Sequence, residues 1–153
     1  SQQFPPGIDR TMRKGNPNYG NHVQLYNGHS CLLTIQLDGQ IIGVYDDENN
    51  SCATMELTSP EFGEVKIRGV GANLYLAFNE SGQLYGEQDP SEEGTVFREI
   101  FHCGYNIYLS KKFENRNWYL GIKKSGAPKN GSSTKAGQKA IQFIPRRKEN
   151  EDL

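Results

Sequence analysis

Short runs of alternating apolar and polar residues, separated by turns, recur along the chain at a nearly constant spacing. In three stretches a strand-like run leads into a glycine-containing turn and then into a second short run that ends in glycine. A two-residue alternation on either side of such a turn is typical of a β-hairpin. The three stretches are residues 32–43, 75–86 and 119–131, and their turn glycines, Gly39, Gly82 and Gly126, lie 43 and 44 residues apart.

A further strand is predicted before and after each hairpin. The leading strands, 23–26, 65–68 and 107–110, begin 42 residues apart, and the following strands lie near 53–57, 96–100 and 140–144. Three such units are too few for a propeller, which needs at least about four blades. They close well as a barrel capped by three hairpins. The pattern therefore predicts an all-β protein, a β-trefoil of twelve strands in three repeats. Almost no helix is expected, since no window has a helical period.

The length of 153 residues is that of one domain. We expect a trefoil domain at 22–147, a flexible N-terminal segment at 1–21 and a flexible acidic tail at 148–153. The longest apolar run, residues 74–78, is far shorter than the roughly 20 residues of a membrane span. No membrane insertion is expected.

Charge is strongly segregated along the chain although the net charge is only −1. Residues 1–110 hold 6 Lys and Arg against 14 Asp and Glu, whereas residues 111–148 hold 11 Lys and Arg against one acid, Glu114. Such a basic block predicts a polyanionic partner, which can be nucleic acid, anionic lipid or a sulfated glycan. A solvated face without a partner is the alternative.

No catalytic or metal-binding pattern is found in the sequence. No CxxC pair is formed by the three cysteines, Cys31, Cys52 and Cys103, which argues against a zinc site. We expect small, partly buried thiols, with one disulfide plus one free thiol as the alternative. The three histidines lack metal-ligand spacing, and no phosphate loop or nucleophile motif occurs. The sequence therefore predicts no enzyme, no metal and no cofactor.

Several motifs together resemble the fibroblast growth factor family, in particular its acidic and basic members. Their order and spacing are specific and cover about residues 22–147. The resemblance implies a secreted β-trefoil ligand that binds heparan sulfate and activates a receptor tyrosine kinase. The motifs are Arg68-Gly69-Val70, residues 75–86, Phe97-Arg98-Glu99, residues 105–108, Trp118-Tyr119, Gly126-Ala127-Pro128-Lys129, Gln138-Lys139 and Phe143-Ile144-Pro145.

A glycan site is predicted at the third hairpin and the loop that follows it. Sulfates need fixed cations and accessible amides, and this glycine-rich segment offers both. The resemblance implies a further contact at Asn27 or Gly28, and Ser133 lacks the basic residue common in the family, so weaker binding is expected. The glycan contacts implied by the lysine cluster and the resemblance are Lys123, Lys124, Lys129, Lys135, Gln138, Lys139 and the backbone of Ala140. Each lysine alone can equally be a solvated surface residue.

The resemblance also implies a surface for a fibroblast growth factor receptor ectodomain. Its apolar contacts are Tyr26, Tyr105 and Ile144, and Glu99 is implied to engage a receptor arginine. Strand packing for the tyrosines, a core position for Ile144 and a plain surface strand position for Glu99 are the alternatives.

Other binding classes fit the sequence less well. A β-trefoil lectin has repeated Gln-x-Trp motifs, and this chain has one Trp. A trefoil protease inhibitor usually has disulfides and needs no basic cluster. An intracellular growth-factor homologue acting as a protein-binding module is expected to depart from the Gly-x-Pro-Lys and Gln-Lys pattern, which is intact here. Nucleic acid is not expected as a partner, because no recognition helix or base-stacking motif is found. Heparan sulfate proteoglycan is the expected co-ligand, outside the cell.

Three Asn-x-Ser sequons are present, at Asn49, Asn79 and Asn130. In a secreted protein, loop sequons are favoured for glycosylation. We expect Asn49 to be occupied first, because it lies in a polar loop-like stretch. Asn130 lies inside the predicted glycan site and is expected to be unmodified.

Overall fold

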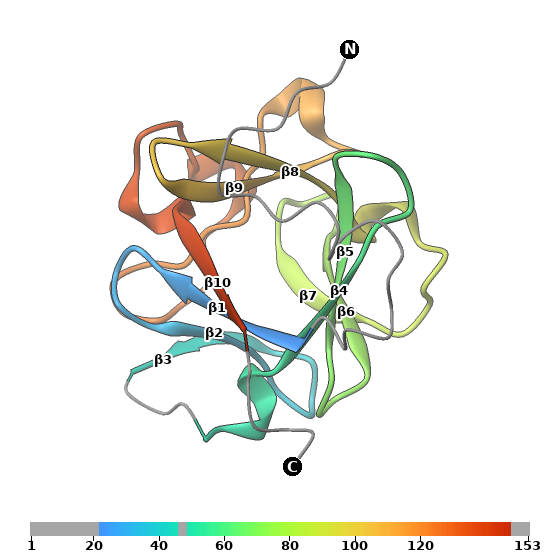
Figure 1. The fold of residues 1–153 in the computed structure, drawn as a ribbon. Coiled ribbons are helices and arrows are strands. Elements are labelled where there is room, and N and C mark those ends of the chain that lie inside the picture. The colour runs from blue at the N-terminus through green and yellow to red at the C-terminus, as the bar shows by residue number, and fades with distance from the viewer. Residues whose placement is uncertain (1–21, 46–48, 148–153) are drawn as a thin grey trace.

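Antiparallel pairing closes six strands into a barrel in the computed structural model, which describes residues 22–45 and 49–147. Around the barrel each strand pairs with the next, and the last returns to the first (Figure 1). In order, the strands are β1 (His22–Asn27), β4 (Met55–Thr58), β5 (Glu64–Gly69), β8 (Val96–His102), β9 (Tyr105–Ser110) and β10 (Phe143–Arg147).

Two of the three hairpins consist of regular strands and extend from this barrel. They are β2 (Leu32–Ile35) with β3 (Ile41–Val44), and β6 (Leu74–Phe78) with β7 (Leu84–Glu87). The described residues thus form ten strands, and the predicted count of twelve is not confirmed. The two absent strands are those of the third hairpin.

The third hairpin is paired, but too sparsely to form strands. An isolated bridge joins Ile122 and Pro128. The N–H of Lys123 donates to the carbonyl of Ala127, and the N–H of Lys129 donates to the carbonyl of Gly121, both at 2.8 Å. Ile122 and Pro128 form a non-hydrogen-bonded pair between these two bonds, so the missing N–H of Pro128 removes no bond from the ladder. The ladder does not continue toward the turn, where the N–H of Ala127 donates to the Ser125 hydroxyl at 3.3 Å. The sequence pattern predicted the hairpin but not this sparse pairing.

A cycle of glycine–glycine hydrogen bonds joins the three hairpins. In each bond the N–H of a glycine that follows one hairpin turn donates to the carbonyl of a turn glycine in another hairpin. The turn glycines have φ angles between +80° and +94°, which L side chains rarely adopt. The bonds are Gly86 to Gly39 (3.1 Å), Gly131 to Gly82 (2.8 Å) and Gly43 to Gly126 (2.7 Å). A barrel with a cap tied in this way is consistent with a β-trefoil.

The core fills the barrel and the space under the cap. On β1 the inward positions, Val23 and Leu25, are 1% and 0% exposed, as the two-residue alternation predicts. Phe78 packs against Trp118 with ring centroids 5.7 Å apart, and Trp118 packs against Phe113 at 4.7 Å. The contact between Phe78 and Trp118 joins the second repeat to the third.

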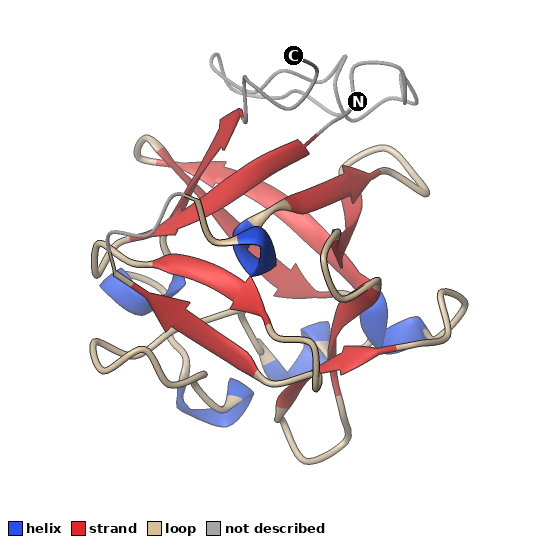
Figure 2. Cartoon of the chain, turned by 90° about the horizontal axis from the view of Figure 1, so that it is seen from below, coloured by secondary structure: helices blue, strands red, loops and turns tan. Residues whose placement is uncertain are grey.

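Helical structure in the described ranges is limited to short 3-10 turns between strands, which confirms the predicted near-absence of helix (Figure 2). These turns are η2 (Ser51–Ala53), η3 (Glu93–Thr95), η4 (Glu114–Arg116), η5 (Gly131–Ser133) and η6 (Lys139–Ile141). None of the helices in this part of the chain is long and apolar enough to cross a membrane.

All three cysteines are free thiols. Cys31 is buried, and burial raises the pKa of its thiol. Cys103 is exposed at the turn between β8 and β9, where its φ angle is +53°. The flexible segments expected at 1–21 and 148–153 lie outside the described residues.

Candidate functional site

Asn27, at the end of β1, anchors the loop that follows the third hairpin. Its side-chain amide donates to the carbonyl of Ala140 at 2.8 Å, and its oxygen accepts from the N–H of His29 at 2.9 Å. The N–H of Gly28 donates to the carbonyl of Gln142 at 2.8 Å. A Cβ at Gly28 would lie 2.5 Å from the carbonyl oxygen of Lys139, so only glycine allows this approach. The end of β1 and the loop are therefore locked together.

Asn27 itself is only 2% exposed. The sequence proposes this residue or Gly28 as a direct glycan contact, and the structure places the Asn27 side chain underneath the loop. Its visible role is to fix the position of Ala140, whose carbonyl also accepts from the N–H of Ile122 at 3.0 Å.

Gln138 holds the loop from within. Its side-chain oxygen accepts from the N–H of Lys135 at 3.0 Å, and its amide donates to the carbonyl of Ser133 at 3.2 Å. The next residue, Lys139, begins η6 and is exposed. These contacts keep the loop compact and leave the lysine side chains directed outward.

Five lysines, here called the basic cluster, surround this framework. Lys123 and Lys124 lie on the third hairpin, whose turn is closed by the N–H of Gly126 donating to the carbonyl of Lys123 at 2.8 Å. The hydroxyl of Tyr45 donates to the carbonyl of Lys124, which ties the third hairpin to the end of the first hairpin. The basic cluster consists of Lys123, Lys124, Lys129, Lys135 and Lys139.

The electrostatics of His29 show that part of the basic cluster converges. The pKa of His29 lies below its ordinary value because of burial and because of the charges of Lys139, Lys124 and Lys129. These three lysines come from both sides of the third hairpin and from the loop. The fold therefore gathers them into one positive field around His29, while Lys123 and Lys135 extend the cluster.

Within the described ranges, no carboxylate pairs with any lysine of the basic cluster. Lysines elsewhere in the third repeat differ: Lys111 lies 2.9 Å from Glu64, and Lys112 lies 3.3 Å from Glu92. Unneutralised lysines on a fixed framework attract an anion more strongly than lysines that already have a carboxylate partner.

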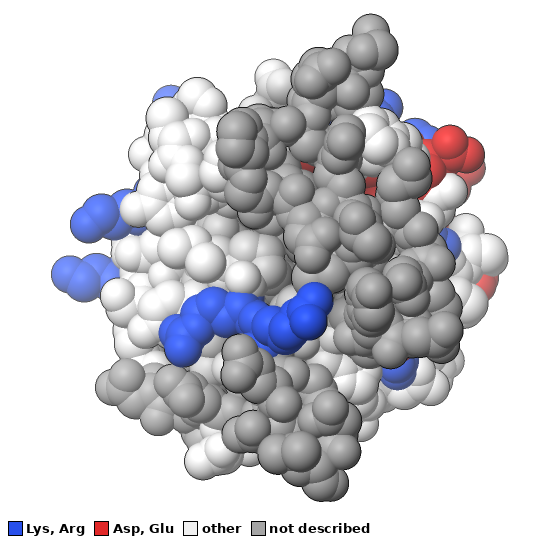
Figure 3. All heavy atoms as spheres, in the orientation of Figure 1, with Lys and Arg blue, Asp and Glu red and all other residues white. Residues whose placement is uncertain are grey.

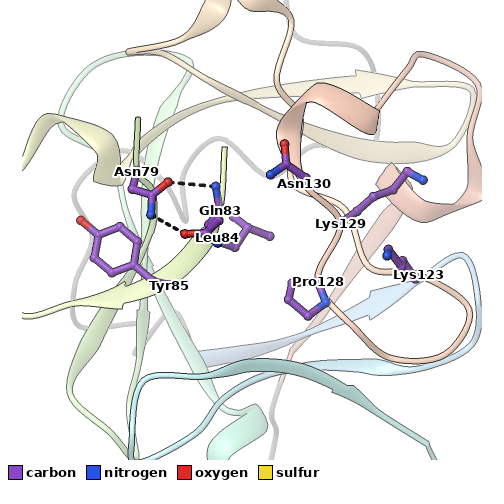
Figure 4. A pocket seen from close by; sticks show the side chains of 8 residues that line it. All are labelled: Asn79, Gln83, Leu84, Tyr85, Lys123, Pro128, Lys129 and Asn130. Carbon is purple, nitrogen blue, oxygen red and sulfur yellow. Dashed lines mark hydrogen bonds between the residues drawn. The ribbon is translucent and has the colours of Figure 1, made fainter. Parts of the chain in front are cut away.

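A cavity of about 450 Å³ adjoins the basic cluster between the second and third hairpins (Figure 4). Lys123, Lys129 and Asn130 border one side, and Asn79 and Gln83 border the other. The amide of Asn79 donates to the side-chain oxygen of Gln83 at 3.0 Å, and the amide of Asn130 donates to the carbonyl of Ser81 at 3.0 Å. This polar surface continues the basic cluster toward the second hairpin.

Tyr26, Ile144 and Tyr105 form a row across three adjacent strands. Tyr26 of β1 faces Ile144 of β10 in the register. Phe143 faces Asn106 of β9, so the next step along both strands places Ile144 beside Tyr105. Ile144 is 43% exposed, and both tyrosines are half-buried. The structure therefore brings the three predicted apolar contacts onto one outer face, and Ile144 is not a core residue.

Glu99 is not the plain surface residue that the sequence allows as an alternative. It is 5% exposed, and its carboxylate accepts hydrogen bonds from the Tyr108 hydroxyl at 3.0 Å and from the Asn106 amide at 3.2 Å. Glu99 faces Tyr108 in the register of β8 and β9, with both side chains on the inner face. Asn106 and Tyr108 were not predicted as partners of Glu99. The inward alternation of residues 106 and 108 was the signal that could have found them.

Comparison with known proteins supports the resemblance. The sequence profile described as Fibroblast growth factor matches residues 21–144. Fibroblast growth factor 1 of Xenopus laevis is 42% identical over 129 residues, which cover 84% of this chain and 83% of the relative. Fibroblast growth factor 1 of Cynops pyrrhogaster is 38% identical over 133 residues, which cover 85% and 88%. The chain belongs to the fibroblast growth factor family.

Proposed function

We propose that this growth factor is an extracellular signalling ligand that binds heparan sulfate through the basic cluster and activates a fibroblast growth factor receptor tyrosine kinase by promoting its dimerisation. The observation that carries the proposal is the basic cluster itself. Its lysines are unneutralised within the described ranges and mostly exposed, and three of them converge on His29. A flexible sulfated chain can contact all of them together.

The framework under the basic cluster favours this kind of ligand. Asn27 and Gln138 fix the loop before any ligand binds, so less ordering entropy is lost on binding. In this proposal the glycan contacts Gln138 and the backbone of Ala140 through hydrogen-bond donors that the preformed loop does not itself use. Family membership also favours receptor and heparan sulfate as the general classes of partner.

Receptor and glycan engage different structural elements in this proposal. The basic cluster belongs to the third hairpin and its loop, whereas Tyr26, Tyr105 and Ile144 lie on barrel strands. A ligand held by both partners turns the second contact into an intramolecular step, which raises its effective concentration. A glycan that spans two ligand–receptor pairs would promote dimerisation in this way.

Family membership implies a non-enzyme, and members of this family need no cofactor. In the part of the chain that the structure describes, no group of three or more His, Cys, Asp and Glu could hold a metal ion. Heparan sulfate is proposed as a co-ligand.

Heparin-affinity chromatography tests the glycan part of the proposal. Replacing Lys124 and Lys139 with Ala removes two charges from the basic cluster, and replacing Lys66 and Lys112 removes two charges elsewhere. Exposed charge contacts are screened by salt, so the first variant should elute at a clearly lower salt concentration than the second. Equal elution of the two folded variants would contradict the assignment of the site.

A further inference from the structure

The turn between β1 and β2 carries His29 at the edge of the basic cluster. The N–H of Ser30 donates to the carbonyl of Asn27, and the N–H of Asn27 donates to the carbonyl of Cys31, both at 2.8 Å, so the backbone is closed around His29. The N–H of His29 itself donates to the side chain of Asn27 at 2.9 Å. Because Asn27 also holds Ala140, the turn and the loop that follows the third hairpin are fixed to the same residue.

The loop that carries Lys139 packs directly against this turn. The N–H of Gly28 donates to the carbonyl of Gln142, and a Cβ at Gly28 would lie 2.5 Å from the carbonyl oxygen of Lys139. In Figure 1 the blue turn after β1 and the orange-red loop lie side by side at the left of the molecule, and Figure 3 shows basic side chains projecting from that edge. His29 follows Gly28 directly and is half-buried.

The third hairpin also packs close to this turn. A Cβ at Gly43 would lie 2.7 Å from the Sγ of Cys31 and 2.8 Å from the Cγ2 of Ile122. Cys31 lies two positions after His29, and Ile122 lies two positions before Lys124. The fold therefore brings the hairpin that carries Lys124 next to the turn that carries His29.

The charges that act on His29 are positive throughout the described part of the chain. Burial lowers the pKa of His29, and the charges of Lys139, Lys124 and Lys129 lower it further. No described carboxylate contributes to this shift, and the buried Cys31 thiol stays uncharged because burial raises its pKa. The imidazole is therefore mostly neutral near pH 7, and it is kept so by charges that a sulfated ligand would neutralise.

We infer that His29 in its protonated form binds a sulfate together with the neighbouring lysines, so that this chain binds heparan sulfate more tightly in acidic than in neutral solution. The inference rests on the proposed glycan-binding function and adds to the five lysines of the basic cluster a sixth cation that is present only in acidic solution. A protonated imidazole has two N–H donors, and each can donate to a sulfate oxygen. The glycan would thus retain this growth factor more strongly in an acidic compartment such as an endosome.

The size of the effect follows from the linkage between proton binding and glycan binding. Bound sulfate raises the pKa of His29, so the affinity for glycan increases as the pH falls through the pKa of the complex. Each unit of this rise corresponds to a tenfold gain in affinity once the pH lies below both values. Asp and Glu, with ordinary pKa values of about 4, stay mostly ionised above pH 5.5 and contribute little.

The test measures the Kd of the full chain for a heparin oligosaccharide at pH 7.5 and pH 5.5, at one salt concentration. The Kd of the unmodified chain should fall at least about threefold at the lower pH. His29→Gln keeps a polar side chain that does not take up a proton, so it should remove most of this change. His29→Lys is charged at both pH values, so it should bind more tightly than the unmodified chain at pH 7.5 and respond little to pH.

His102→Gln is the matched control, because His102 is an exposed histidine at the end of β8. This variant should keep the pH dependence of the unmodified chain. Thermal melting at both pH values verifies that every variant is folded.

The outcomes separate this inference from the proposed function. If the unmodified chain binds heparin with the same Kd at both pH values, the inference fails, whereas glycan binding itself stands. If the pH dependence persists in His29→Gln, another group causes it and the inference is overturned. If the unmodified chain does not bind heparin at either pH value, the proposed function itself fails.

Discussion

Replacing Asn27 with Ala tests whether this residue positions the glycan loop or contacts the glycan directly. The change removes two hydrogen bonds, of 2.8 Å to Ala140 and 2.9 Å from His29. The carbonyl of Ala140 still accepts a hydrogen bond from Ile122. The free energy of unfolding should therefore fall by about 1–2 kcal/mol, the lower part of the range for a buried polar group that loses one partner. For a domain of this length, 1 kcal/mol lowers Tm by roughly 2–4 °C. We therefore expect a decrease in Tm of about 2–8 °C.

Calorimetry measures this stability loss, and heparin binding at several salt concentrations measures its consequence. Asn27→Ala should weaken heparin binding without changing the slope of log Kd against log salt concentration, because no charge is removed. Lys139→Ala should decrease the magnitude of that slope by about one, because about one fewer counterion is released on binding. Asn115→Ala, at an exposed position, is the control and should change neither Tm nor affinity. Weaker heparin binding with an unchanged Tm would refute the positioning role.

Three further predictions concern other parts of the molecule. The pKa of His29 lies below the ordinary 6.5, so the unfolded state takes up the proton more readily, and the free energy of unfolding should fall as the pH decreases below about 6.5. Adding a heparin oligosaccharide should raise the pKa of His29 in an NMR titration, because sulfates offset the lysine charges; an unchanged pKa would place the glycan elsewhere. Gly131→Ala should cost about 1–3 kcal/mol in a denaturant titration, because its Cβ would lie 2.6 Å from the Trp118 ring, and an unaltered midpoint would show that the ring can move. In protein secreted from animal cells, mass spectrometry should find a glycan on the exposed Asn49 and none on Asn130, whose amide donates to Ser81; a glycosylated Asn130 that still binds heparin tightly would contradict the site.

The repeats of the fold could be predicted from the sequence because they depend on local signals. The turn glycines and the alternating runs mark each hairpin, and Gly39 and Gly82 have the positive φ angles that their turns require. The strand count could not be predicted to the same level. In the third hairpin one isolated bridge, between Ile122 and Pro128, forms where the sequence pattern indicates two paired strands.

The sequence predicted which residues belong to the candidate site, but not the contacts that hold them in place. The lysine spacing and the resemblance identified the basic cluster, because charged residues close in sequence remain close on a short loop. The contact from Asn27 to Ala140 spans 113 positions, and residue type alone does not indicate which partner a buried amide will choose. The same limit applies to Glu99, whose burial depends on the register between β8 and β9.

Receptor phosphorylation in cells stripped of heparan sulfate tests the central proposal most directly. Such cells, expressing a fibroblast growth factor receptor, are treated with the unmodified chain or with a variant in which Lys123, Lys124, Lys129 and Lys139 are replaced by Ala, with and without added heparin. We predict weak phosphorylation without heparin, strong phosphorylation when heparin is added to the unmodified chain, and little response of the variant to heparin. Full phosphorylation by the unmodified chain in the absence of heparin, equalled by the variant, would contradict the proposal.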